Sequence, residues 1–198
     1  RRPPRSKLFP YTTLFRSTFW VYMVGALALA GIFPFAGFWS KDEILLDAPL
    51  HYPHVYWILS AAAFLTAFYM GRQVWMVFFG KARHQAAEQA EESPLVITVP
   101  LIILAVLSAL GGFMNLPFKG FHQFGYWLAN TLGKVEFPPF DFVVAGLSTV
   151  LALGAIALSW FIYQRKPLEH GDPDPLAKPL GPVFVGMENK WFIDEAYQ

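Results

Sequence analysis

Four charged side chains lie inside or directly beside long apolar stretches of this sequence. Lys41, Asp42 and Glu43 follow the apolar residues 18–40, and Arg72 interrupts a second apolar run. A lysine removed from water loses the solvation that favours its charged form, so it can bind and release a proton during turnover. Arginine stays protonated in proteins and acts as a fixed charge. The pattern therefore predicts Lys41 as a proton carrier, with Asp42, Glu43 and Arg72 in electrostatic roles.

The spacing of these residues limits how they can cooperate. Successive helical positions point about 100° apart, so residues 41–43 cannot all face one channel. We expect one carboxylate to pair with Lys41 while the other meets water or a different helix. The alternative for Lys41 is that its side chain extends to the membrane surface. For Arg72, pairing with a carboxylate, an effect on the lysine and simple anchoring all remain open.

The segment that carries Lys41 is predicted to be a broken membrane helix. Pro34 lacks an N–H and clashes with the preceding turn, and Gly31 and Gly37 loosen the same region. A continuous helix over residues 18–47 would be roughly 45 Å long, more than a hydrocarbon core of about 30 Å requires. We therefore expect two half-helices that meet within the membrane, with Lys41 at the start of the second.

Composition places the chain in a membrane. Of its 198 residues, 55% are hydrophobic and 15% are charged, and its mean hydropathy is +0.39. A net charge of +1 without a basic cluster gives no support to nucleic-acid binding. The absence of cysteine excludes thiolate-bound clusters, thiolate zinc sites and disulfides from this sequence. His51 and His54 are interpreted as solvated loop residues, so no metal site is expected.

The expected fold is all-α, a fragment of a polytopic transmembrane helical bundle whose first helix is discontinuous. Hydropathy and turn residues predict four spans in region 18–166, at about 18–47, 55–79, 94–114 and 141–164. Residues 115–140 are expected to form an interfacial loop with a short surface helix. Residues 167–198 are expected to form a proline-rich membrane-surface segment in which residues 183–198 recover helical spacing.

Other polar residues receive structural interpretations. Ser60, Thr66 and Tyr69 in the second span are predicted to serve helix packing. Trp191, Asp194 and Glu195 are typical of docking at a membrane surface. Residues 1–17 contain LFPYTTLFRS, which resembles the translation of a sequencing-library adaptor, so we interpret them as a non-native segment.

The distribution of basic residues predicts the orientation. The faces after the first and third spans carry Lys41, Lys119 and Lys134, and the other face carries Lys81, Arg83, Arg165 and Lys166. Because cytoplasmic loops carry an excess of basic residues, the second face is predicted to be cytoplasmic. Lys41 is then expected to lie toward the outer side.

Four stretches, in order, resemble one protein family. GALALAGIFPFAGFWSKDEIL is similar to the broken-helix motif of the antiporter-like chains of proton-pumping NADH:quinone oxidoreductase (respiratory complex I), closest to its L chain. Phe33 stands where the family usually has a first proline. TAFYMGRQVWMVFFGKAR, ESPLVITVPLIILAVLSALGGFMNLP and DPLAKPLGPVFVGMENKWFIDEAYQ resemble the family's following segments.

The resemblance implies a C-terminal fragment of a proton-translocating subunit that supplies part of the proton channel on the outer side. The activity would be that of a translocase whose NADH, FMN, iron–sulfur clusters and quinone are held by other chains, with no redox site here. The implied partners are other membrane and peripheral subunits, the lipid bilayer and protons, in a bacterial inner membrane. The large subunit of a multisubunit Na⁺/H⁺ antiporter and a non-catalytic anchor or assembly chain are the alternatives.

Overall fold

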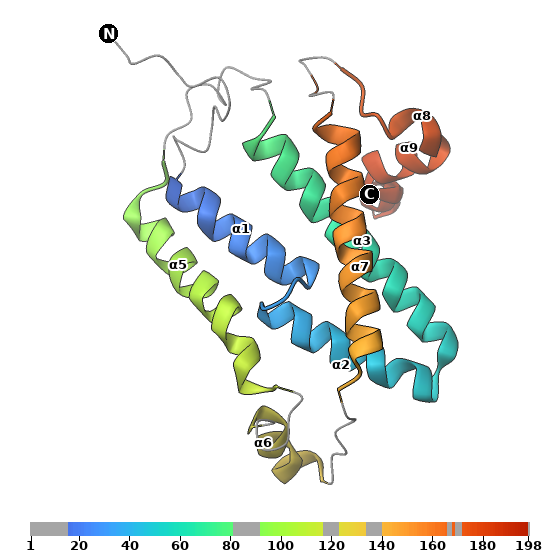
Figure 1. The fold of residues 1–198 in the computed structure, drawn as a ribbon. Coiled ribbons are helices and arrows are strands. Elements are labelled where there is room, and N and C mark those ends of the chain that lie inside the picture. The colour runs from blue at the N-terminus through green and yellow to red at the C-terminus, as the bar shows by residue number, and fades with distance from the viewer. Residues whose placement is uncertain are drawn as a thin grey trace.

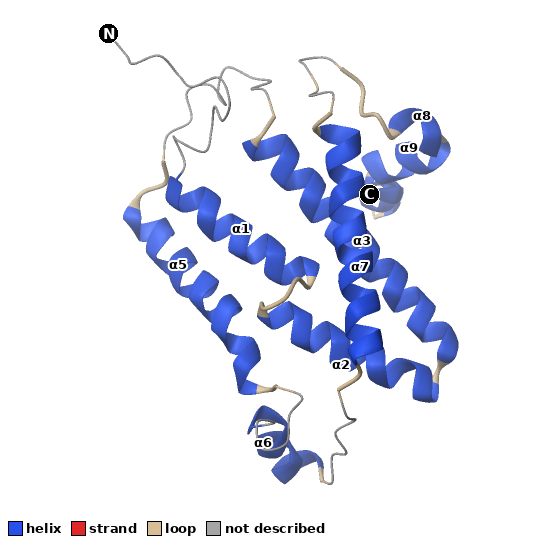
Figure 2. Cartoon of the chain, viewed as in Figure 1, coloured by secondary structure: helices blue, strands red, loops and turns tan. Residues whose placement is uncertain are grey.

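The computed structural model describes residues 16–80, 92–116, 123–133, 140–165, 168 and 172–197. Its helices, in chain order, are α1 (Arg16–Ala30), α2 (Ala36–His51), α3 (Pro53–Phe78), α5 (Leu95–Leu110), η1 (Gly111–Met114), α6 (Gln123–Leu132), α7 (Phe142–Tyr163), α8 (Ala177–Leu180), α9 (Pro182–Glu188), η2 (Lys190–Phe192) and α10 (Ile193–Ala196). The described residues form helices joined by loops and turns (Figures 1 and 2). The predicted all-α fold is therefore confirmed.

The predicted break in the first membrane helix is present. Helix α1 ends at Ala30 and α2 begins at Ala36, with Gly31 at a φ of +78° and a cis bond between Phe33 and Pro34. Figure 2 shows the loop that joins the two half-helices. Glycine accepts the positive φ without a steric cost. The chain thus leaves the helical conformation at Gly31 and Pro34, the residues from which the break was predicted.

Gly37 allows the start of α2 to approach the end of α1. A Cβ atom built on Gly37 would overlap the backbone carbonyl of Ala28. The backbone of α1 cannot yield as a flexible side chain would, so any larger residue must separate the two half-helices. The close contact at Gly37 therefore sets the geometry of the break.

Within the described residues, three helices are long and apolar enough to cross a membrane: Pro53–Phe78, Leu95–Met114 and Phe142–Tyr163. The remaining predicted span, the broken one at about 18–47, is divided in the structure between α1 and α2. Large apolar side chains of α5 point outward, and Val96 is 84% exposed. In a membrane, an outward apolar surface of this kind suits contact with lipid.

Small residues bring the long helices together. Ala67 of α3 and Ala152 and Ala155 of α7 form a buried cluster with Ala30 at the end of α1. Small side chains permit the close backbone approach that stabilises helix pairs in membranes. The end of α1, where the chain breaks, is thereby held against the α3 and α7 pair.

The connection between the first two predicted spans is shorter than the predicted bounds of about 47 and 55 imply. The loop expected at 48–54 is reduced to Tyr52, because α2 continues through Pro49 to His51 and α3 starts directly at Pro53. The Tyr52 N–H donates to Ala48 O at 2.8 Å and closes the last turn of α2. Pro53 fits the first turn of α3, where the absent N–H has no helical partner to lose.

The helix expected over residues 183–198 is interrupted. Lys190, Trp191 and Phe192 all have positive φ values, which separate α9 from α10. A Cβ on Gly186 would lie 2.9 Å from the Trp191 ring, so the chain reverses to place the indole against a glycine surface. The contact between Trp191 and Gly186 therefore occurs where the chain leaves the helical conformation between α9 and α10.

Other helix ends follow the sequence more closely. The Asp141 side chain accepts a hydrogen bond from the Val143 N–H at 2.7 Å and so caps the start of α7, at the boundary predicted for the last span. The expected surface helix in residues 115–140 is α6. Of the segment 1–17, residues 1–15 lie outside the described residues, whereas Arg16 and Ser17 begin α1.

Glu92, in the approach to α5, holds the first turn of α1. Its Oε1 accepts hydrogen bonds from Thr18 Oγ1 at 2.6 Å, Ser17 Oγ at 2.8 Å and Thr18 N at 3.2 Å. The first N–H groups of a helix have no intrahelical partner, so an external carboxylate can satisfy one of them. The hydrogen bond from Thr18, supported by Ser17, holds the pKa of the exposed Glu92 below its usual range.

We expect Gly37→Ala to destabilise the folded chain by about 1–3 kcal/mol, because the new methyl group meets backbone rather than a movable side chain. Thermal unfolding of the complete subunit in detergent would measure this effect. Gly146→Ala and Gly154→Ala are matched controls, since no atom lies within 4 Å of a Cβ at either position. Equal stability of Gly37→Ala and the controls would contradict the close contact.

The protection of the first turn of α1 should depend on pH. A lowered pKa means that the Glu92 carboxylate contributes its stabilisation above the ordinary glutamate pKa of about 4.3 and loses it as pH falls through the lowered value. Hydrogen exchange, corrected for the intrinsic pH effect, should show this loss around Thr18. Glu92→Ala should remove the protection at every pH, whereas Glu188→Ala on α9 should leave it intact.

Candidate functional site

The three consecutive ionisable residues of α2 contact three different parts of the fold. Lys41 Nζ donates a hydrogen bond to Leu29 O of α1 at 2.6 Å. Asp42 Oδ1 accepts from Ser148 Oγ of α7. The third residue, Glu43, contacts the segment after η1. These directions agree with the expected rotation of about 100° per residue, which keeps the three side chains from one common channel.

Lys41 lies at the carboxyl end of α1. The last carbonyl groups of a helix have no intrahelical partners and carry partial negative charge, so an ammonium group is stabilised there. The half-buried lysine stem also passes Gly31, where a Cβ would lie 2.9 Å from Lys41 Cδ. Gly31 therefore serves both the positive φ of the break and the path of the lysine.

The expected ion pair between Lys41 and a neighbouring carboxylate is not seen in the described residues. Asp42 turns instead into the helix bundle and is only 6% exposed. Its Oδ2 is buried, and it has no hydrogen-bond partner among the residues that the structure describes. A buried polar atom without a partner is costly, which marks Asp42 as unusual within the bundle.

Glu43 connects the second half-helix to the membrane-surface elements. Its Oε2 accepts from Asn115 Nδ2 at 3.1 Å, and Asn115 Oδ1 accepts from the Gly125 N–H of α6 at 3.3 Å. One asparagine thus bridges α2 and α6. This arrangement supports a positioning contact for Glu43 rather than proximity to Lys41.

Arg72 pairs with a carboxylate, which was one of its open alternatives. Its Nη2 lies 2.5 Å from Asp174 Oδ2, in the segment before α8. The guanidinium also lies over the Tyr163 ring at 5.2 Å, close enough for a cation–π interaction. The structure therefore brings Arg72 to the end of α7, whereas Lys41 contacts the end of α1.

Sequence reasoning missed three partners of these residues: Ser148, Asn115 and Asp174. Each is separated by tens of positions from the charge that it contacts, so spacing gave no signal for the pairing. Ser148 could have been noted as a hydroxyl in an uncharged span, and Asp174 as an acidic residue in a proline-rich segment.

Two of the other polar residues make local contacts. Thr66 Oγ1 donates to Ala62 O within its own helix at 2.7 Å. Asp194 pairs with Lys190 at 2.8 Å on the surface. The side chains of His51 and Glu195 lie outside the described residues. No group of three potential His, Cys, Asp or Glu metal ligands occurs in the described part of the chain.

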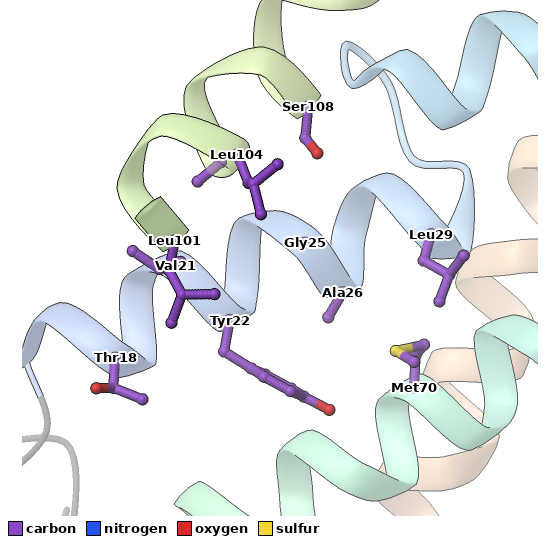
Figure 3. Close-up of a pocket in the computed structure, with 11 residues that line it drawn as sticks. Thr18, Val21, Tyr22, Gly25, Ala26, Leu29, Met70, Leu101, Leu104 and Ser108 are labelled. Carbon is purple, nitrogen blue, oxygen red and sulfur yellow. The ribbon is translucent and has the colours of Figure 1, made fainter. Parts of the chain in front are cut away.

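A separate apolar cavity of about 270 Å³ lies between α1, α3 and α5 (Figure 3). Tyr22 and Met70 face it from α1 and α3, and Leu101 and Leu104 face it from α5. The Tyr22 hydroxyl donates to Gln73 Oε1 at 2.7 Å. Neither Lys41 nor a carboxylate lines this cavity, so it does not belong to the candidate proton site.

Comparisons with known proteins agree with this membrane architecture. The chain is 35% identical over 189 residues to NAD(P)H-quinone oxidoreductase subunit 5, chloroplastic, from Mesostigma viride, a match that covers 89% of this chain and 28% of that protein. It is 32% identical over 200 residues to NAD(P)H-quinone oxidoreductase chain 5 from Picosynechococcus sp., covering 89% and 30%, respectively.

A third relative carries the corresponding L name. The chain is 38% identical over 145 residues to NADH-quinone oxidoreductase subunit L from Campylobacter jejuni, covering 70% of this chain and 23% of that protein. The chain therefore spans less than a third of the length of these three relatives. No protein-family model matches it. The ordered sequence matches and the helical membrane fold establish that the chain belongs to the family of NAD(P)H-quinone oxidoreductase subunit 5 and NADH-quinone oxidoreductase subunit L proteins.

Proposed function

We propose that the chain is part of a proton-translocating membrane subunit of NADH:quinone oxidoreductase and that Lys41 carries the proton. The observation that supports this role most directly is the 2.6 Å hydrogen bond from Lys41 Nζ to Leu29 O at the helix break. The names of the relatives support quinone oxidoreduction as the activity of the assembly. The complete subunit and its partners are required for that activity.

The helix end provides a physical means of controlling Lys41. Its negative dipole end attracts the ammonium form more strongly than the neutral amine. Proton release therefore weakens the attraction to Leu29 O and allows the amine to reorient. Proton uptake restores the attraction. In this proposal, Lys41 exchanges protons with a water path toward the outer side of the membrane.

The neighbouring charges act from different positions. Asp42 provides a buried carboxyl against α7, where its Ser148 contact fixes one oxygen. Glu43 Oε2 accepts a hydrogen bond from Asn115 Nδ2 at 3.1 Å and so holds α2 against the segment after η1. Asp42, Glu43 and Arg72 contribute electrostatic or positioning effects in the assembled subunit, while Lys41 is the group that changes protonation.

The wider assembly follows from the same proposal. NADH, FMN, iron–sulfur clusters and quinone are assigned to other chains, with this chain contributing no redox centre. Other membrane and peripheral subunits, lipids and protons are its partners. We assign the chain to a bacterial inner membrane. The Campylobacter relative supports that location, while the chloroplastic relatives place related subunits in plastids as well.

Lys41→Met should slow proton translocation by at least about tenfold, because the titratable amine is removed while most of the apolar stem remains. Lys41→Arg should cause a similar loss, since arginine retains charge but does not release its proton. The measurement is proton translocation and quinone-linked NADH oxidation in membranes that contain the complete complex.

Assembly must be checked by native gel for each variant. Lys190→Met and Lys190→Arg provide surface controls and should retain normal translocation. Near-normal translocation in assembled Lys41→Arg would identify a fixed anchor instead of a proton carrier. If the chain were a non-catalytic anchor, Lys41→Leu and Arg72→Leu should both leave proton translocation unchanged.

A further inference from the structure

Asp174 joins the segment after the last long helix to two membrane helices. Its Oδ2 contacts Arg72 Nη2 of α3 at 2.5 Å, and its Oδ1 accepts from the Tyr163 hydroxyl at 3.0 Å. The Leu176 N–H also donates to Asp174 Oδ1 at 2.9 Å. Three donors from three parts of the chain therefore converge on one carboxylate.

This cluster is suited to holding a charged pair within an apolar environment. The side chain of Asp174 is only 12% exposed, and that of Arg72 is 41% exposed. A charged group at membrane depth requires a counter-ion or access to the interface. Asp174 supplies the counter-ion to Arg72, and the Tyr163 ring covers the guanidinium. Removing either charge would leave the other only partly compensated.

The following residues lie against the end of α7. We use the name return segment for residues 172–180, which include α8. Leu176 and Pro179 of the return segment and Phe161 and Ile162 of α7 line one cavity of about 790 Å³. Figure 1 shows α8 beside the upper end of α7. Beside this groove, the contacts of Asp174 with Arg72 and Tyr163 supply a specific polar attachment.

We propose that Arg72 is a docking site for the Asp174 carboxylate and that this pair fixes the return segment to α3 and α7. Arg72 is thus a positioning residue for this segment. Its positive charge is required to receive Asp174, with no direct role in changing the protonation of Lys41. This inference is independent of the proposed proton-carrier role of Lys41.

A chemical cross-link can measure docking in the complete complex. Because this sequence has no cysteine, cysteines introduced at Ile162 and Leu176 provide a defined pair within the chain. A short bis-maleimide should join them when the return segment is docked. Mass spectrometry of the linked peptides distinguishes this product from links to other chains.

Arg72→Gln and Asp174→Asn should each lower the cross-link yield by about tenfold, because each leaves one charge without its partner. The double variant Arg72→Gln/Asp174→Asn should recover most of the yield, since neither charge remains and the two amides can hydrogen-bond. The exposed Lys190–Asp194 pair provides a control: Lys190→Gln should leave the yield unchanged.

Proton translocation in the same variants separates docking from an effect on Lys41. If Arg72 acts through docking, translocation should fall in the single variants and recover with the cross-link in the neutral double variant. Recovered docking without recovered translocation would overturn the assignment, because the charge itself would then be required. Unchanged cross-linking in both single variants would overturn the docking interface.

The reversed pair Arg72→Asp/Asp174→Arg supplies a second test with both charges present. Docking and translocation should again recover together relative to either reversed single variant. Failure of both double variants to recover cross-linking, in complexes that assemble normally, would contradict the proposal. Lys41→Arg remains a separate test, because it should block translocation without changing this cross-link.

Discussion

The contact between the two half-helices of the first span determines the organisation of the candidate proton site. Gly37 brings α2 against the Ala28 carbonyl, and Gly31 turns the chain between them. This arrangement leaves Leu29 O available to Lys41. A continuous helix would use such a carbonyl internally. The break therefore exchanges part of the regular backbone hydrogen-bond pattern for a bond to a titratable side chain.

The α3 and α7 pair supports this site through both apolar and polar contacts. Ala67 and Ala155 are fully buried in the close-packed region between the helices. Further along α3, Trp75 Nε1 donates to Ser159 Oγ of α7 at 3.1 Å. The same α7 carries Ser148 to Asp42 and Tyr163 to Asp174. One membrane helix thus connects the buried carboxyl of α2 with the attachment of the return segment.

Local sequence signals explain why the break and the α7 cap were predictable. Gly31, Pro34 and Gly37 restrict the local backbone, and Asp141 can satisfy a nearby N–H without information about the rest of the fold. Interactions between distant residues were not predictable in this way. Asp42 and Ser148 are 106 positions apart, and Arg72 and Asp174 are 102 positions apart. Helix packing selects these partners only after the chain has folded.

In the C-terminal region, too, the sequence pattern did not predict a feature that depends on contacts between separated residues. Helical spacing in residues 183–198 did not reveal the three positive φ values at Lys190, Trp191 and Phe192. The Trp191 contact with Gly186 depends on the reversal itself. Local propensity therefore predicts helical turns in this segment, whereas the contact between its two ends accounts for their division.

The directions of the three charged residues on α2 have a mechanical consequence. Lys41 holds the half-helix toward α1, Asp42 toward α7 and Glu43 toward Asn115. Rotation of α2 about its own axis in either sense would strain contacts on three sides together. These three contacts therefore oppose rotation of α2 as a rigid body. Charge within the half-helix can move more easily through changes in the conformation of individual side chains.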